Sequence, residues 1–312
     1  MSLVINWQAA NGAVKYRLYR DTSKFTLKTL PTDVKEVLAT DPLKYEYTDA
    51  KRQTVYWFVI SSIDADGREV FGRIFPQGYF PETGPGPTTL LRGDWEFGYF
   101  GDVLPADLFT YQEIQSQLIA DGRTPPPITG NATKWRKCVV NGNIIFIPDA
   151  YWGMLNRNGN LVFDKMLYLK QMGFCGNNAD ITGATVVTKN GFSYRHRLPL
   201  VSTNKPTSTI YSGLDVLGED VLKSEIGMIN ALGSNSAVTQ NAQNASNLNG
   251  LTVYRHLNDD VQLAVPSMHQ NSAATNNSGI GQWGTTTLGG IGVVGWSFNT
   301  NANFYPILEL VF

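Results

Sequence analysis

Alternation of apolar and polar residues marks the clearest element of this chain, residues 54–73 (TVYWFVISSIDADGREVFGR). Every second residue near its start has a large apolar side chain: Tyr56, Phe58 and Ile60. That period of two is typical of a β-strand. Asp64 and Gly67 then favour a tight turn, because Asp bonds to its own backbone and Gly accepts a positive φ. An extended run follows, so the pattern predicts an antiparallel hairpin.

Shorter alternating segments predict further strands in the first eighty residues: 3–7, 15–20 and 45–49. Residues 32–40 fit either a helical turn or a loop. Prolines and glycines, which interrupt strands and helices, then gather in one stretch: Pro76, Gly78, Pro81, Gly84, Pro85, Gly86 and Pro87. We therefore expect a first domain at 1–75, a semi-stiff hinge at 76–89 and a second domain at 90–312, with a candidate internal boundary near residue 202.

The second domain shows hairpin and helix patterns. Asn141 and the glycine after it lie between apolar runs in residues 135–148, and Asn-Gly is the strongest two-residue hairpin signal. Residues 185–200 repeat this pattern around Asn190. Helical spacing of apolar residues predicts helices within three segments: 104–120, 149–174 and 214–232. The apolar run at 303–312 predicts a last strand that is held in a core or an interface.

Composition also favours a β-rich protein. Charged residues make up 16% of the chain, below the roughly 25% of an average domain. The net charge of −1 gives no general attraction to nucleic acid or to an anionic membrane. No apolar run approaches the roughly 20 residues of a transmembrane helix, and the start of the chain lacks a signal-peptide pattern, so we expect synthesis in the cytoplasm. Cys138 and Cys175 are expected to be reduced and buried.

Candidate chemical motifs are few, and each has a simpler structural explanation. Residues 290–295 match Gly-x-Gly-x-x-Gly, but no βαβ unit fits after them, which favours a glycine-rich turn or strand over a nucleotide site. The histidines lack metal-ligand spacing. Carboxylates occur in pairs, Asp94 with Glu96 and Asp259 with Asp260, and such pairs are more often solvated turn residues than a glycosidase site. We predict no catalytic residue, no cofactor and no metal.

Residues 1–75 resemble a fibronectin type III domain, which is a β-sandwich. The hairpin at 54–73 is similar to the last two strands of that family, which carry Tyr-x-Tyr-x-Val-x-Ala-x-Asp-x-x-Gly. Trp7 matches the family's buried tryptophan, residues 16–20 its third strand, and residues 47–49 its Tyr-x-Asp. The chain starts almost directly on the family's second strand. The resemblance therefore implies an open sheet edge that another segment or a partner covers.

Residues 90–312 resemble, in separate pieces, the virion structural proteins of tailed bacteriophages and prophages. Residues 135–148 are similar to a Trp-x-Lys…Asp-Gly-Lys-x-Leu-Phe-Ile-Pro hairpin of those proteins, and 93–103 to a Gly-Asp…Gly-Phe-Phe-Gly-x-Val element. Residues 304–310 are similar to their Trp-Arg-Pro-x-Leu-Glu-Leu ending. The pieces occur in the family's order, whereas three residues depart from its pattern: Asn143, Phe304 and Tyr305. The resemblance implies a β-rich assembly domain that contacts other virion proteins and copies of itself.

Large aromatic residues form the candidate interface, because Trp and Tyr combine a large contact area with a polar group. The set is Trp95, Tyr99, Phe100, Trp152, Trp283, Trp296, Phe304 and Tyr305. The alternatives for these residues are positions in the hydrophobic core, or stacking against a sugar.

We therefore expect a mainly β protein, with a fibronectin type III-like β-sandwich followed by a larger β-rich mixed domain with a few short helices. The expected function is a non-enzymatic structural component of a phage virion, in the tail, baseplate, collar or capsid surface. We expect neither nucleic-acid binding nor membrane insertion. A receptor- or carbohydrate-binding module with a host-surface glycan as partner is the first alternative. An enzyme that acts on cell-wall polysaccharide is the second.

Overall fold

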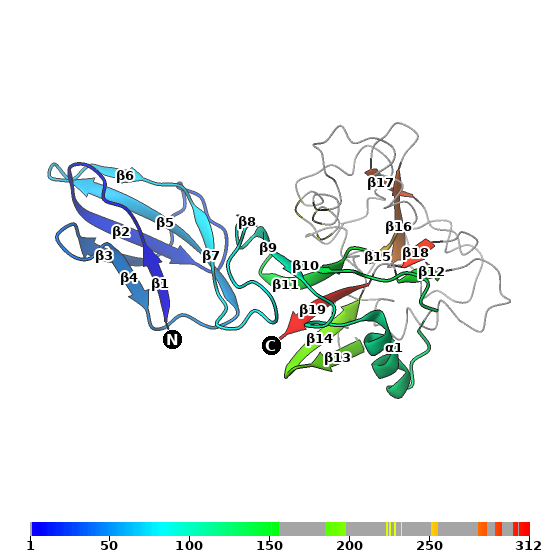
Figure 1. Cartoon of the computed structure of the whole chain (residues 1–312). Coiled ribbons are helices and arrows are strands. Elements are labelled where there is room, and N and C mark those ends of the chain that lie inside the picture. The colour runs from blue at the N-terminus through cyan, green and yellow to red at the C-terminus, as the bar shows by residue number, and fades with distance from the viewer. Residues whose placement is uncertain are drawn as a thin grey trace. The chain divides into compact units, whose positions relative to one another are not determined.

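The computed structural model describes most of the first half of the chain and parts of the second. The described ranges are 2–125, 127–150, 152–155, 185–197, 251–254, 280–285, 291–294, 302–304 and 306–312, with the single residues Lys223, Glu225, Met228 and Leu232. In these residues the protein is mainly β, with several sheets and one short helix of defined bounds (Figure 1). The chain divides into two compact units, Met1–Thr83 with Arg92–Gly98, and Gly84–Leu91 with Tyr99–Phe312.

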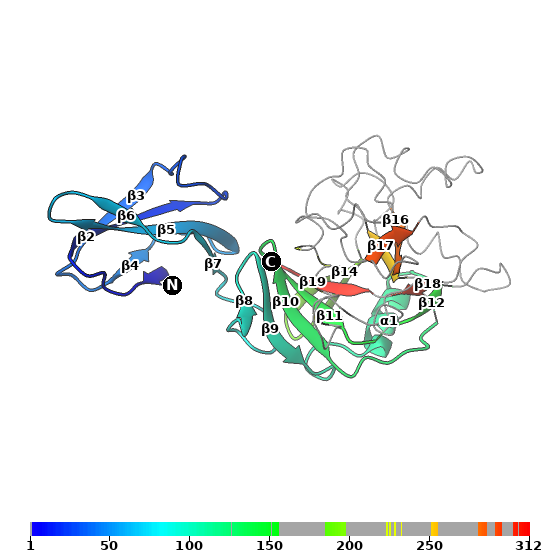
Figure 2. The ribbon, with the colours of Figure 1, turned by 90° about the horizontal axis from the view of Figure 1, so that it is seen from above.

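The first unit contains two sheets that share one core. The smaller sheet pairs β1 (Leu3–Asn6) with β4 (Lys44–Tyr47). The strands of the larger sheet are, in order, β3 (Asp33–Leu38), β2 (Ala13–Asp21), β5 (Thr54–Asp64) and β6 (Glu69–Phe71), with β7 (Phe75–Tyr79) also paired to β5. The long strands β2 and β5 lie side by side at its centre (Figure 2). Both sheets contribute to the core: Leu3, Ile5, Leu18, Val37, Tyr47, Tyr56, Phe58 and Tyr79.

The hairpin of β5 and β6 confirms the element predicted at residues 54–73. Oδ1 of Asp64 accepts hydrogen bonds from the backbone N–H groups of Asp66 and Arg68, both at 2.9 Å. Gly67 has a φ of 81°, a backbone conformation that residues with a Cβ atom rarely adopt. The turn chemistry that the sequence predicts is therefore the chemistry that closes this hairpin.

Two expectations for the first unit are wrong. Residues 32–40 form neither a helical turn nor a loop but include β3, because Val37 buries its side chain in the core while its neighbours face solvent. Pro76 and Gly78 belong to β7 rather than to a hinge. A proline is tolerated there because β7 is paired on one side only, so the missing N–H removes no bond on the open side.

The largest sheet has seven strands and contains the last strand of the chain near its centre. Their order is β13 (Thr185–Lys189), β14 (Phe192–Arg197), β19 (Ile307–Val311), β11 (Asn143–Pro148), β10 (Trp135–Val140), β9 (Phe97–Val103) and β8 (Arg92–Gly93). Ile307 and Leu308 are fully buried. The prediction of a last strand held in a core is confirmed for β19. The apolar run at 303–312 is however divided, since β18 (Ala302–Phe304) pairs with β12 (Gly153–Leu155) instead.

Both hairpins predicted in the second unit are present. Asn141 and Gly142 have φ values of 50° and 79°, and Asn190 and Gly191 of 54° and 81°. Two consecutive positive φ angles are the signature of the type I′ turn, which Asn-Gly favours. The strands that flank these turns are β10 with β11 and β13 with β14.

The helix α1 (Tyr111–Ala120) is shorter than the predicted segment 104–120. It begins after Thr110, whose hydroxyl accepts from the backbone N–H of Glu113 while the Glu113 carboxylate accepts from the backbone N–H of Thr110. This capping box fixes the start of the helix. Tyr111, Ile114 and Leu118 face the core, as the spacing predicted.

The other expected helices lie mostly outside the described residues. Within 149–174, the structure describes the strand β12. Within 214–232, Glu225, Met228 and Leu232 are helical. A three-stranded sheet joins β15 (Leu251–Tyr254), β16 (Ile280–Thr285) and β17 (Ile291–Val294). The Gly-x-Gly-x-x-Gly motif at 290–295 thus contains a strand, which is one of the structural alternatives predicted for it.

Candidate interaction surface

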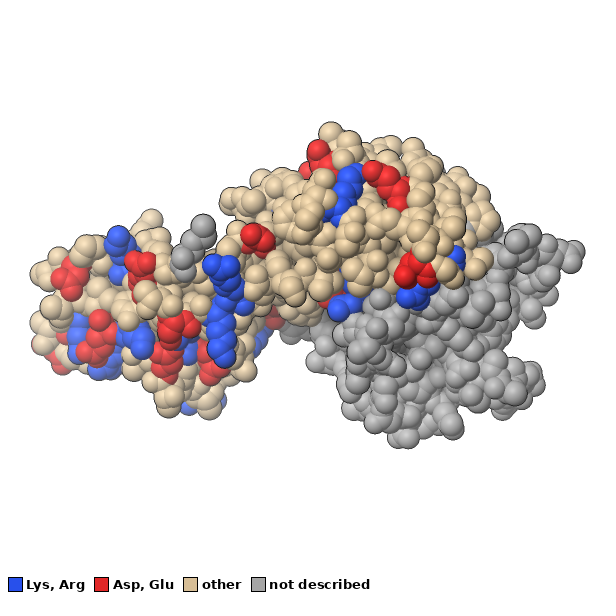
Figure 3. Space-filling view, turned by 90° about the horizontal axis from the view of Figure 1, so that it is seen from below, with Lys and Arg blue, Asp and Glu red and all other residues tan. Residues whose placement is uncertain are grey.

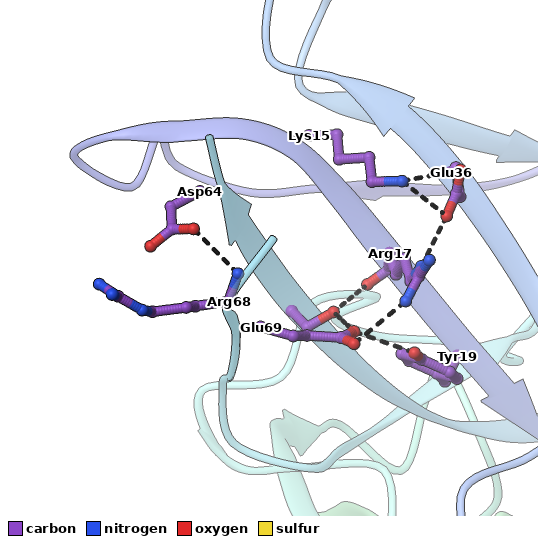
Figure 4. A network of polar contacts seen from close by, with 8 residues as sticks. Lys15, Arg17, Tyr19, Glu36, Asp64, Arg68 and Glu69 are labelled. Carbon is purple, nitrogen blue, oxygen red and sulfur yellow. Dashed lines mark hydrogen bonds and ion pairs between the residues drawn. The ribbon is translucent and has the colours of Figure 1, made fainter. Parts of the chain in front are cut away.

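A continuous polar network covers the face of the larger sheet of the first unit that points away from the core (Figure 4). Alternate residues of a strand point to opposite faces, so the burial of Leu18 on one face of β2 places Arg17 and Lys15 on the other. Arg17 lies opposite Glu36 on β3, and its Nε donates to the Glu36 carboxylate at 2.6 Å. The Nζ of Lys15 donates to the same carboxylate at 3.3 Å.

The network continues from Arg17 to Glu69 on β6. Nη1 of Arg17 contacts Oε2 of Glu69 at 3.1 Å. The other oxygen of Glu69 accepts from the hydroxyl of Tyr19 at 2.9 Å and from that of Ser61 at 2.5 Å. We call Lys15, Arg17, Tyr19, Glu36, Ser61 and Glu69 the β2 polar network. It joins four strands of the sheet: β3, β2, β5 and β6.

The β2 polar network is ionised and balanced, with two cations and two carboxylates. Hydrogen bonds from Arg17 and Lys15 hold the pKa of Glu36 below its ordinary value. Burial raises the pKa of Glu69, but the hydrogen bonds from Ser61 and Tyr19 and the charge of Arg17 outweigh burial, so the pKa of Glu69 is lowered. Both carboxylates are therefore charged at neutral pH and are already paired.

Exposed apolar side chains border the β2 polar network on the same face. Val34 lies opposite Tyr19 and is 39% exposed, and Leu38 lies opposite Lys15 and is 56% exposed. On the other side the ring of Tyr19 contacts that of Phe71, with centroids 5.9 Å apart. Paired polar groups beside exposed apolar groups are compatible with a non-obligate protein–protein interface, which is about as apolar as the rest of a protein surface.

Trp95, a predicted interface residue, is half-buried and fixed within the first unit. Its ring stacks on Phe80, with centroids 4.8 Å apart and planes 9° apart. It also lies so close to Gly78 that a Cβ at that position would come within 2.3 Å of the ring. Beside it in sequence, Glu96 accepts from Nζ of Lys24 at 3.0 Å, and this Nζ lies 4.8 Å from the ring centroid of Trp57.

The other predicted interface residues have three different outcomes. Phe100 and Trp152 are fully buried, so they are core residues and their assignment to an interface is corrected. Tyr99 is half-buried, and its hydroxyl donates to Oδ1 of Asp102 at 2.5 Å. The backbones of Trp283 and Phe304 lie in β16 and β18. Trp296 and Tyr305 lie outside the described residues.

A buried lysine, which the sequence analysis did not single out, holds part of the predicted hinge on the second unit. Lys137 is fully buried, and its Nζ donates to the backbone carbonyls of Pro87 at 2.8 Å and Gly84 at 3.2 Å. Burial lowers the pKa of Lys137 to about 8. The sequence of β10 does not reveal this role, because the carbonyl groups that Lys137 contacts lie about fifty residues earlier in the chain.

A buried ionic cluster in the second unit joins β14, β19 and the helical residue Glu225. Arg197 contacts Oε1 of Glu225 and Oε2 of Glu309, each at 2.6 Å, and Arg195 contacts Oε1 of Glu309 at 2.8 Å. Burial alone would lower the pKa of Arg197, but the two carboxylates raise it. Between the two arginines, burial lowers the pKa of His196 to about 3, which keeps this imidazole neutral.

Other predicted chemistry can be located in the described residues. Oδ1 of Asp94 accepts from the backbone N–H groups of Glu96 and Phe97, so this acid closes a turn. Asp259 and Asp260 lie outside the described residues. Cys138 is free and buried, as predicted, and Cys175 is not described. In the part of the chain that the structure describes, no three metal-ligating side chains gather, and no helix is long and apolar enough to cross a bilayer.

No protein-family model matches the chain, and no curated protein or solved structure is significantly similar to it.

Proposed function

We propose that this chain is a non-enzymatic structural component of a tailed-bacteriophage virion that assembles through protein–protein contacts, and that its first unit is a fibronectin type III-like β-sandwich. The two sheets around one core support the proposal of a fibronectin type III-like β-sandwich. The virion role is supported by three motifs that resemble virion proteins and occur in that family's order, at 93–103, 135–148 and 304–310.

The observation that carries the assembly role is the outer face of the larger sheet of the first unit. The β2 polar network is paired before any partner arrives, so a partner buries no lone charge, and burying an unpaired charge is strongly unfavourable. The side chains are also ordered in advance, which reduces the entropy lost on binding. Val34 and Leu38 add apolar area to the contact. The view in Figure 3 shows acidic and basic side chains interspersed over the first unit.

Labelling of particles tests the virion role. Antibodies against the chain are applied to purified phage particles and located by electron microscopy. Label at one fixed position, such as the collar or the baseplate, is the expected result. Intact particles without label, although the chain is present in the infected cell, would overturn the proposal.

Substitution on the outer face tests the assembly surface itself. Leu38→Glu replaces exposed apolar contact area beside the β2 polar network with a carboxylate and upsets its balance of charge, so we expect less of the chain in purified particles by quantitative immunoblot. The control is Leu27→Glu, since Leu27 is 47% exposed but lies outside the strands of this face. Equal incorporation of both variants would exclude this face as the assembly surface.

A receptor- or carbohydrate-binding role is the second candidate, and one observation favours it. Lys24 lies between the half-buried ring of Trp57 and the carboxylate of Glu96, which places an aromatic ring and polar groups together. This is the combination that sugars require. Binding on a glycan array that Trp57→Ala removes would support this role, and an array without binding would exclude it for the sugars tested.

A further inference from the structure

The strand β1 has an open edge. In the described residues it pairs with β4 and with no other strand. The backbone N–H of Trp7 donates to the carbonyl of Leu43 at 3.1 Å, in the same register that pairs Ile5 with Tyr45 and Leu3 with Tyr47. Hydrogen-bonded and non-hydrogen-bonded pairs alternate along an antiparallel ladder. The odd-numbered residues of β1 therefore bond to β4, and the backbone groups of Val4 and Asn6 point to the open edge.

The open edge of β1 differs from the other edges of the first unit. Native proteins protect exposed edges with charged residues, with proline or with very short strands. The strand β3 carries Asp33, Lys35 and Glu36, and β4 carries Lys44 and Glu46. The three-residue strand β6 is very short, and β7 contains Pro76. The four residues of β1, Leu-Val-Ile-Asn, include neither a charge nor a proline. An edge without such protection is suited to pairing with another strand.

We propose that two copies of this chain pair through β1, antiparallel and about a two-fold axis. A two-fold axis requires a self-complementary register. The open-edge groups belong to Val4 and Asn6, and we place the axis beside Val4, so that its outward N–H and C=O bond to those of the partner's Val4. Ser2 lies opposite the partner's Asn6, and Leu3 opposite the partner's Ile5. The proposal concerns the first unit alone and does not depend on a role in a virion.

Every pair in this register is chemically matched. Leu3 and Ile5 are each 4% exposed and point into the core, so their pairing extends the apolar interior across the axis. Val4 is 43% exposed on the outer face, where it covers the partner's Val4. Ser2 and Asn6 form a polar pair, and no charged residue of β1 meets a like charge. The two-stranded sheet becomes a four-stranded one, β4-β1-β1-β4, which is a more stable size than an isolated pair of strands.

Two substitutions at Val4 separate this pairing from the fold of the unit. Val4→Pro removes an N–H that points away from β4, so β1 stays paired within the unit while the bond across the axis is lost. Val4→Glu acts through charge repulsion. Glu46 lies opposite position 4 on β4, so the new glutamate and Glu46 of both copies place four carboxylates side by side across the four-stranded sheet. We expect a dimer of the wild-type chain in sedimentation equilibrium, and at least about a tenfold weaker dimer for either variant. Thermal unfolding checks that each variant is folded.

Matched controls make the result specific to β1. Val70→Glu places the same charge on another exposed valine, 66% exposed on β6, and we expect it to leave the dimer unchanged. Val4→Glu mixed with Val4→Lys opposes a carboxylate and an ammonium group at the axis, so we expect the mixture to recover the dimer. Amide hydrogen exchange of wild type adds a readout without any variant, since the N–H groups of Val4 and Asn6 are protected only in the dimer.

Several results would overturn the proposal. These are a wild-type chain that stays monomeric up to roughly 100 μM, or a dimer whose strength Val4→Pro and Val4→Glu leave unchanged. Exchange of the Val4 and Asn6 amides that is equally fast at all protein concentrations would overturn it as well. A result of this kind leaves the labelling of particles unaffected, so the two proposals fail separately.

Discussion

The two units use charge in opposite ways. Charged residues are about twice as frequent in residues 1–83 as in the rest of the chain. Apart from Arg20, which is buried and pairs with Asp33 and Asp49, the described charges of the first unit are exposed or half-buried. The second unit buries Lys137 and the cluster of Arg197, Glu225 and Glu309. Exposed ion pairs contribute little to stability, but a buried pair that loses one partner is strongly destabilising. The β2 polar network of the first unit can thus serve recognition, while the buried charges of the second unit determine how its own strands fit together.

The largest expected effect is at Glu309. Glu309→Gln removes the negative charge that Arg195 and Arg197 share and leaves a buried excess of positive charge. We expect the second unit to lose about 3 kcal/mol of unfolding free energy, measured by denaturant titration with circular dichroism. A loss below about 1 kcal/mol would show that this cluster behaves like a surface pair.

The next effect tests how tightly Trp95 packs on β7. Gly78→Ala places a methyl group within 2.3 Å of the Trp95 ring, and overpacking of this kind costs about 2 kcal/mol. We expect a lower unfolding midpoint and altered tryptophan fluorescence. In Gly78→Ala with Trp95→Ala the clash is absent, so the double variant should lose less than the sum of the single losses. Additive losses would mean that the two residues are not in contact.

A smaller effect depends on pH and on Lys137. The pKa of this lysine is about 8 in the folded protein, below its ordinary 10.5. Between pH 7 and about pH 9 the unfolded chain therefore binds more protons than the folded one, and stability rises with pH by about 1 kcal/mol relative to a variant without the amine. We expect this difference between wild type and Lys137→Met in denaturant titrations at both pH values. The control is Lys189→Met, which removes a lysine that pairs with Glu113. The pH dependence of its stability should equal that of wild type.

The smallest effect is expected at Glu36. Its side chain is 48% exposed, and water replaces its contacts with Lys15 and Arg17 when the charge is removed. We expect the unfolding midpoint of Glu36→Gln to equal that of wild type. A clear loss of stability would erase the contrast between the units and would make the β2 polar network a structural element of the first unit.

Local chemistry explains which elements the sequence predicts. The Asn-Gly turns at residues 141 and 190 and the Asp64 turn were predicted correctly, because a turn is determined by the few residues that form it. The strand β3 was missed because its only deeply buried side chain is Val37, and a single apolar position shows no period. The strand β7 was missed because proline and glycine exclude a central strand but not one that is open on one side.

The candidate site was harder to predict than the fold. An aromatic residue has the same sequence signal in a core and on a surface, so Phe100 and Trp152 were assigned to an interface although they are buried. The ionic partners were missed for another reason. Arg17 meets Glu69 only because β2, β5 and β6 are neighbours, and Arg197 meets Glu309 across 112 residues of sequence. Such pairs depend on strand order, which local patterns do not contain.

The division of the chain into units affects how the protein can be dissected. The polypeptide passes from one unit to the other three times, after Thr83, after Leu91 and after Gly98. A fragment that stops at residue 83 therefore omits Trp95 and exposes the Phe80 ring on which it stacks. A fragment that stops at residue 75 also loses all of β7 except Phe75. After one proteolytic cut between residues 84 and 98, the two halves of the chain should stay associated, because residues on both sides of the cut belong to the first unit. A recombination point at residue 75 would divide the first unit. The shortest recombinant fragment that retains the contacts of the first unit ends at Gly98.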